Sequence, residues 1–218
     1  RAGAGETQIE VDRRIIRKKI SLLKKKLKSI DSERKVQSKK RKSFFRTSFV
    51  GYTNVGKSSL MKSVTKSDVL IRNQLFATLD TTVRRLFIGN NNYVLLSDTV
   101  GFIRNLPDNL IASFKSTLQE VVDSDLLLIV LDANSKDLFN EIETIKSVLK
   151  EINANEIDYK YVFNKIDLVD PDKISYLKQS FPDSLMVSAT RSLQVSDIKD
   201  TIAEKYEEWV SALKNPLH

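Results

Sequence analysis

Apolar positions along the chain follow two different patterns, which meet near Lys42. After that point, short apolar runs alternate with amphipathic stretches of helical period, a pattern that predicts strands alternating with helices. The predicted strands are residues 45–50, 83–88, 93–97, 126–132, 159–164 and 185–187. The predicted helices are residues 57–66, 108–122, 138–153, 172–179 and 194–213.

This alternation predicts a three-layer α/β fold, in which a mostly parallel six-stranded sheet carries helices on both faces. The segment IGNNNY, residues 88–93, has the glycine and asparagine content of a tight turn between two strands. One pair of strands at the edge of the sheet is therefore expected to be antiparallel.

Before Lys42 the pattern is that of one long helix. No glycine or proline occurs from Glu10 to Ser38, and apolar residues recur at alternating steps of four and three, at Ile16, Ile20, Leu23, Leu27 and Ile30. Such a heptad seam predicts a helix that packs on a partner helix. We therefore expect a basic helical arm over residues 1–42, followed by one domain over residues 43–218.

Positive charge is concentrated in the arm. Residues 1–46 contain 17 Lys and Arg against 5 Asp and Glu, a net charge of +12, whereas the remaining 19 against 23 give −4. A surface of this density favours a polyanion such as RNA, because neutralised phosphates release their counterions. A membrane surface is the weaker alternative, since the apolar stripe is narrow and lacks aromatic residues.

Composition removes several kinds of chemistry. The chain has no cysteine, which excludes disulfides and thiolate metal sites and fits a reducing compartment, and its one histidine is the last residue, His218. The longest apolar run, LLLIVL at 126–131, is too short to span a bilayer. The chain opens on RAGAGETQIE without a methionine, so we expect it to be part of a longer protein.

The segment GYTNVGKS matches the phosphate-binding pattern G-x-x-x-x-G-K-[ST], directly after a predicted strand and at the start of a predicted helix. Glycines allow backbone N–H groups to surround phosphates, the lysine reaches the outer phosphates and the serine hydroxyl ligates magnesium. The expected nucleotide-binding residues here are Gly51, Tyr52, Thr53, Asn54, Val55, Gly56, Lys57, Ser58 and Ser59.

The segment DTVG follows the third predicted strand, at the carboxyl edge where ligands of α/β sheets bind. The carboxylate of Asp98 is expected to hold the metal and the N–H of Gly101 to meet the terminal phosphate, with Thr99 and Val100 between them. The tetrapeptide alone is weak evidence for a nucleotide site. Its position at a strand end, about forty residues after Lys57, makes the evidence strong.

Two later segments predict the base-binding end of the site. In NKID, comprising Asn164, Lys165, Ile166 and Asp167, the last carboxylate can accept two N–H bonds from the guanine edge. Adenine would leave that acceptor unpaired, at a cost of about 1–3 kcal/mol. In VSAT, residues 187–190, backbone N–H groups of Ser188, Ala189 and Thr190 are expected to support the same base.

These four motifs, in this order, resemble the core of the Ras-like GTPases. The segments GAGETQIEVDRR, GYTNVGKS, QLFATLDTTVRR and DTVGFIRNLP together resemble the HflX family of ribosome-associated GTPases, over most of the chain. The resemblance implies hydrolysis of GTP, Mg²⁺ as cofactor, the large ribosomal subunit and its RNA as partner, splitting or rescue of ribosomes, and a monomer in the cytoplasm. It also implies an N-terminal domain that the chain does not include before Arg1.

The resemblance further implies a switch segment that binds the nucleotide, formed by Phe76, Ala77, Thr78, Leu79 and Asp80, with Thr78 joining Ser58 and Asp98 at the metal. The catalytic set is then Lys57, Thr78 and Gly101. From the residues alone, Thr81 and Thr82 are equal candidates for the switch threonine. Asn54 resembles the asparagine of potassium-assisted GTPases, although a loop hydrogen bond explains an asparagine there equally well.

Phe102 follows Gly101, where many nucleotide hydrolases carry a glutamine that orients the attacking water. A phenylalanine cannot do this, so we expect slow intrinsic hydrolysis that a ribosome accelerates. Two alternatives stay open at this point. The chain is a ribosome-assembly or RNA-modifying GTPase of the Era kind, or it is a GTP-gated module for RNA or membrane in which hydrolysis is incidental.

Overall fold

The structure is a computed structural model that describes residues 10–23, 25–26, 44–66, 82–99, 101 and 118–214. The chain divides into two compact units, Arg1–Lys42 and Ser43–His218. In the first unit, residues 10–23 and 25–26 are helical, within the long helix predicted from the sequence. Ile16, Ile20 and Leu23 of the heptad seam are 56, 46 and 52% exposed, so packing of this seam on a partner stays a prediction.

In the second unit, the described strands form one six-stranded sheet in the order β2-β3-β1-β4-β5-β6. The strands are β1 (Arg46–Val50), β2 (Thr82–Gly89), β3 (Asn92–Asp98), β4 (Leu126–Asp132), β5 (Asp158–Asn164) and β6 (Leu185–Met186). β1 pairs in parallel with β3 and β4, whereas β2 pairs with β3 in antiparallel fashion. The predicted fold class, including its antiparallel edge, is confirmed.

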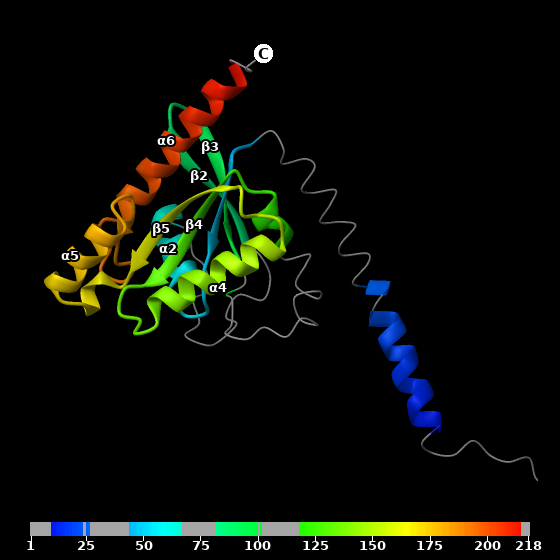
Figure 1. The fold of residues 1–218 in the computed structure, drawn as a ribbon. Coiled ribbons are helices and arrows are strands. Elements are labelled where there is room, and N and C mark those ends of the chain that lie inside the picture. Colours follow the sequence, from blue (N-terminus) through cyan, green and yellow to red (C-terminus); the bar gives the residue numbers. More distant parts are fainter. Residues whose placement is uncertain are drawn as a thin grey trace, which may run out of the picture. The chain divides into compact units, whose positions relative to one another are not determined.

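Helices cover both faces of this sheet. They are α2 (Lys57–Thr65), α4 (Leu138–Glu151), α5 (Pro171–Ser180) and α6 (Val195–Lys214), with a short 3₁₀ turn, η1 (Ile166–Leu168). Figure 1 shows α4 in front of the sheet and α2 behind it. Residues 118–122 are helical and belong to the predicted helix 108–122, whose earlier part lies outside the described residues. None of the helices that can be described is long and apolar enough to cross a membrane.

The central strand β1 is held from both faces. The ring of Phe45, just before it, packs edge-on against Tyr206 and Trp209 of α6, with centroids 6.1 and 5.8 Å away. On the opposite face, the hydroxyl of Ser48 lies 2.7 Å from that of Ser124. Because β1 is fixed along its length, the loop that follows Val50 leaves the carboxyl edge of the sheet from a rigid support.

Candidate functional site

Two glycines shape the loop between β1 and α2, residues 51–56. Gly51 and Gly56 have φ angles of 153° and 99°, and a Cβ on either would overlap a neighbouring atom. At Gly51 that atom is the carbonyl oxygen of Val130 in β4, and at Gly56 it is the side-chain nitrogen of Asn164. The loop therefore lies closer to its surroundings than any residue with a side chain allows.

Lys57, the first residue of α2, turns its side chain back into this loop and is only 6% exposed. Its ammonium donates to the carbonyl oxygens of Gly51 and Tyr52, at 3.0 and 2.8 Å. Burial lowers the pKa of Lys57 to about 8, against the opposing effect of the nearby Asp98 carboxylate. A buried cation at a helix N-terminus, ringed by backbone, is the arrangement that receives a phosphate chain.

Ser58 and Asp98 bring two hard oxygen donors together beside Lys57. The Ser58 hydroxyl donates to Asp98 Oδ2 at 2.5 Å, across a chain separation of 40 residues, and Asp98 is 1% exposed at the end of β3. Hydroxyl and carboxylate oxygens are the ligands that Mg²⁺ takes alongside waters and phosphate oxygens. No group of three or more His, Cys, Asp or Glu side chains in the described part of the chain could hold a metal.

The loop after β3 is anchored against the phosphate loop. The hydroxyl of Thr99 donates to the carbonyl of Phe49 in β1 at 2.7 Å. Two residues later, Gly101 lies so close to Thr53 that a Cβ there would come within 2.8 Å of its backbone. The sequence assigned Gly101 to the terminal phosphate, and the structure brings it to the rim of the phosphate loop.

Asn164, at the end of β5, connects three segments of the site. Its side-chain amide donates to the carbonyl of Val55 at 2.8 Å and its side-chain oxygen accepts from the N–H of Ala189 at 3.0 Å. Both polar atoms of this buried side chain thus act on backbone, one in the phosphate loop and one in the loop after β6. Asn164 therefore connects the phosphate loop to the loop after β6.

Lys165 also contacts the phosphate loop, from a left-handed backbone conformation with φ of 64°. Its ammonium donates to the carbonyl of Asn54 at 2.8 Å and to the carboxylate of Asp132 at 2.7 Å. Two residues on, Asp167 lies in η1 with its side chain exposed, at the same edge of the sheet. Asp167 is therefore open to a ligand, whereas the side chains of Asn164 and Lys165 hold the loop.

The loop after β6 closes the other side of this edge. Ser188 is fully buried, and its hydroxyl accepts from the N–H of Arg191 at 3.1 Å. The carbonyl of Ala189 accepts from the Ser63 hydroxyl of α2 at 3.3 Å, while Thr190 is exposed. The predicted base-binding loop is thus tied to the helix that begins at the phosphate loop.

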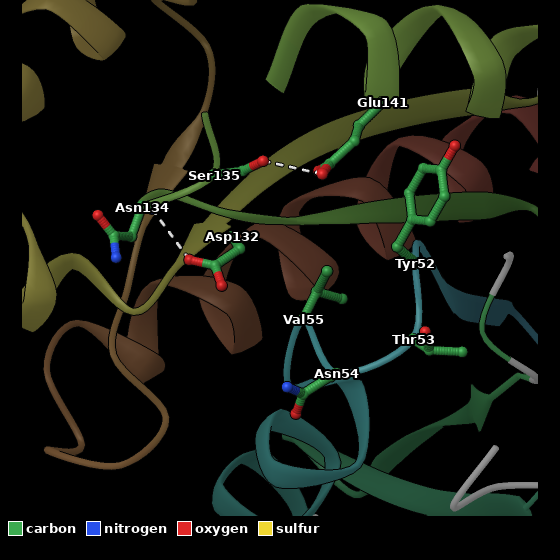
Figure 2. A pocket seen from close by; sticks show the side chains of 8 residues that line it. All are labelled: Tyr52, Thr53, Asn54, Val55, Asp132, Asn134, Ser135 and Glu141. Atoms are coloured by element: carbon green, nitrogen blue, oxygen red, sulfur yellow. Dashed lines mark hydrogen bonds between the residues drawn. The ribbon is translucent and has the colours of Figure 1, made fainter. Parts of the chain in front are cut away.

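A pocket of about 360 Å³ lies beside the phosphate loop, and sequence reasoning assigned only one side of it. Figure 2 shows Tyr52, Thr53, Asn54 and Val55 on one side of it. On the other side lie Asp132 of β4, Asn134 and Ser135 of the turn after it, and Glu141 of α4. Asp132 was missed although it ends a strand at the carboxyl edge, a position that favours functional residues in α/β folds. Its partner, Lys165, follows the next strand, so only the pairing of β4 with β5 reveals the contact.

Several predicted residues lie outside the described part of the chain: Phe76, Ala77, Thr78, Leu79, Asp80, Val100 and Phe102. The switch segment and the residue after Gly101 are therefore not placed. Of the predicted set, the structure brings the phosphate loop, Asp98, Thr99, Gly101, residues 164–167 and residues 188–190 to one edge of the sheet.

Known proteins match both units of the chain. Residues 46–165 match the model of the 50S ribosome-binding GTPase family, and residues 1–41 match the GTP-binding GTPase Middle Region. Among solved structures, a GTP-binding protein from the hyperthermophilic archaeon Sulfolobus solfataricus in complex with GDP is 27% identical, with a TM-score of 0.63 over 90% of this chain and 60% of that one.

Curated relatives narrow the family. GTPase HflX of Flavobacterium psychrophilum is 53% identical over 165 residues, which cover 76% of this chain and 40% of that protein. GTPase HflX of Gluconacetobacter diazotrophicus is 42% identical over 205 residues, 94% of this chain and 46% of that protein. The chain thus spans less than half the length of these relatives. It belongs to the family of 50S ribosome-binding GTPases, among the members represented by HflX.

Proposed function

We propose that this chain is the part of an HflX-like protein that binds and hydrolyses GTP and links that cycle to the large ribosomal subunit, where the whole protein splits or rescues ribosomes. The observation that carries the proposal is the Ser58–Asp98 contact beside the buried Lys57, with Asp167 exposed at the same edge of the sheet. These residues support a metal site, a phosphate site and a guanine-selective acceptor at the same edge of the sheet. Under this proposal the protein works in the cytoplasm, where ribosomes are.

In the proposed mechanism, Lys57 and the N-terminus of α2 bind the outer phosphates of GTP. Ser58 and Asp98, with Thr78 from the switch segment, would hold Mg²⁺, which neutralises charge on the phosphate oxygens when it is bound. The close approach of Gly101 to Thr53 supports a role for the Gly101 N–H at the terminal phosphate. Water then attacks in line, and the group that orients it is not evident at Phe102.

Asn54 gives a reason to propose potassium as a second cation. It is exposed in the phosphate loop and its side chain lines the pocket of Figure 2. An amide oxygen is a suitable ligand for a monovalent cation beside phosphates. Faster GTP turnover in KCl than in NaCl of equal ionic strength supports this role, and equal rates reject it.

Sedimentation with purified ribosomal subunits tests the choice of partner. The protein should pellet with large subunits in a non-hydrolysable GTP analogue and be released in GDP, because only the triphosphate is expected to order the switch segment. Large subunits should also raise single-turnover hydrolysis by orders of magnitude, as partner-supplied groups do in other GTPases.

Other outcomes favour the alternatives. Association with small subunits or assembly intermediates would favour a GTPase of the Era kind. Binding to RNA that depends on GTP, without any stimulated turnover, would favour a GTP-gated binding module. An intrinsic rate as fast as the stimulated one would contradict the expected dependence on the ribosome.

A further inference from the structure

The backbone of the phosphate loop is held by two side chains from outside it. The side-chain amide of Asn164 donates to the carbonyl of Val55, and the ammonium of Lys165 donates to the carbonyl of Asn54. The two carbonyl groups are consecutive along the loop. Both are therefore directed toward β5, away from the interior of the loop where the Lys57 ammonium lies.

Because the peptide bond is planar, the direction of each carbonyl also sets the direction of the N–H group that follows it. In a trans peptide the carbonyl oxygen of one residue points opposite to the N–H of the next. The bond from Lys165 to the Asn54 carbonyl therefore directs the N–H of Val55 away from Lys165. The bond from Asn164 to the Val55 carbonyl likewise directs the N–H of Gly56 away from Asn164. These N–H groups are the ones that a phosphate chain needs, so the two side chains pre-organise the donors before a ligand arrives.

Asp132 fixes the second of these side chains. Its Oδ2 accepts from the Lys165 ammonium at 2.7 Å, and its other oxygen, Oδ1, accepts from the N–H of Asn134 at 2.9 Å. The bond from the Asn134 N–H thus orients the carboxylate so that its other oxygen faces the lysine. With side chains only 24 and 25% exposed, the ion pair is partly shielded from solvent.

Strand pairing explains why the three groups meet. β4 and β5 are parallel, and their register places Asp132 opposite Asn164, one residue before Lys165. Asn54 and Lys165 both adopt left-handed backbone conformations, with φ of 63° and 64°, which residues with side chains seldom occupy. The Lys165 ammonium therefore joins two backbone positions that are both left-handed.

We propose that Asp132 is a positioning residue for nucleotide binding: its carboxylate holds the Lys165 ammonium on the Asn54 carbonyl, keeps the Val55 N–H aimed at the phosphates and so slows nucleotide release. The inference rests on the nucleotide site proposed above. It does not depend on which ribosomal partner the protein has.

Release of fluorescent GDP from the whole chain is the direct test. Asp132→Ala should release GDP about fivefold to tenfold faster than the unmodified chain, the size expected for one charge-assisted contact. In steady-state turnover the change should fall on KM rather than kcat, because the contact acts on binding. Asp172→Ala, which removes an exposed carboxylate from α5, is the matched control and should release GDP at the original rate.

Two further variants separate positioning from a merely structural role. Asp132→Asn keeps an oxygen for the Asn134 N–H but removes the charge that faces Lys165, so it should resemble Asp132→Ala. Combining Asp132→Ala with Lys165→Met should release GDP about as fast as Lys165→Met alone, because the aspartate acts through the lysine. An Asp132→Asn variant with the original release rate, or effects that multiply in the double variant, would overturn the proposal.

Asp167→Asn distinguishes a failure of this inference from a failure of the site. The amide donates where the carboxylate accepted, so this variant should lose guanine nucleotides and gain xanthine nucleotides, which offer the complementary acceptor. If that exchange of preference occurs and Asp132→Ala still releases GDP at the original rate, the inference about Asp132 is wrong on its own. If the preference does not change, the site assignment is wrong and the inference falls with it.

Discussion

Lys57 shows at the level of one residue how the site is prepared for an anion. Its ammonium is almost completely buried, and among the described residues its hydrogen bonds go to two neutral carbonyls of the loop. Burial of a charge without a full counter-charge disfavours the charged form, which is why its pKa falls to about 8. A phosphate supplies the missing negative charge and should raise the pKa of Lys57 again.

Proton uptake on binding follows from this lowered pKa. The unliganded lysine loses its proton as the pH rises through about 8, whereas the phosphate-bound lysine keeps it. Affinity for GDP should therefore be constant below that pH and fall above it. Calorimetry at pH 8 in buffers of different ionisation enthalpy should show protons taken up as GDP binds, and Lys57→Met should show none from this group. A binding enthalpy independent of the buffer would contradict the prediction.

At the level of elements, local sequence decides where helices and turns begin. The turn between β2 and β3 has left-handed Asn90 and Asn91, with φ of 50° and 60°, as the asparagine-rich segment predicted. α5 begins at Pro171, one residue before the predicted start, because Asp170 caps it and proline suits the first helical position. The side chain of Asp170 accepts from the N–H of Lys173 at 2.7 Å.

Asp170→Ala should lower the free energy of unfolding by about 1 kcal/mol, since it leaves a helix N–H without its cap. Guanidinium or urea unfolding followed by the fluorescence of Trp209, the single tryptophan, measures this change. Asp183→Ala, which removes an exposed carboxylate from the turn after α5, should have an effect near zero. Equal losses in the two variants would show that net charge, and not the cap, was responsible.

For the whole molecule, the boundary between the two units is also the boundary between a net positive and a net negative part of the chain. The first unit, Arg1–Lys42, has 16 Lys and Arg against 5 Asp and Glu, a net charge of +11, whereas the second unit, Ser43–His218, has 20 against 23, a net charge of −3. The second unit contains the sheet and the candidate site. The side chains that hold the phosphate loop, Asn164 and Lys165, belong to the second unit. Nucleotide binding and binding of polyanions are therefore expected to be separable.

A chain shortened to residues 43–218 should keep its affinity for GDP and lose most of its affinity for ribosomal RNA. The loss should be largest at low salt, because binding that releases counterions weakens steeply as salt concentration rises. Filter binding of labelled RNA across a salt series, with GDP affinity measured on the same sample, checks both statements. Equal RNA affinity of the two chains at every salt concentration would reduce the first unit to a structural helix.

The sequence alone determined the order of the described strands and helices, the phosphate loop and the position of Asp98 at the end of a strand. These features depend on local patterning, because apolar periodicity and turn composition act over a few residues. The apolar run 126–131 predicted a strand, which the structure shows as the buried strand β4. The glycines at 51 and 56 predicted a close approach of backbone groups, and the structure shows such an approach at both positions.

Tertiary structure decided which side chains of the motifs bind ligand and which hold the loop. Asn164 and Lys165 belong to the same four-residue motif as Asp167, yet their polar atoms act on the phosphate loop, more than 100 residues earlier in the chain. Asp132 joins them only because β4 and β5 pair in one particular register. Strand register depends on the packing of whole side-chain sets on both faces of the sheet, so no local pattern in the sequence can specify this contact.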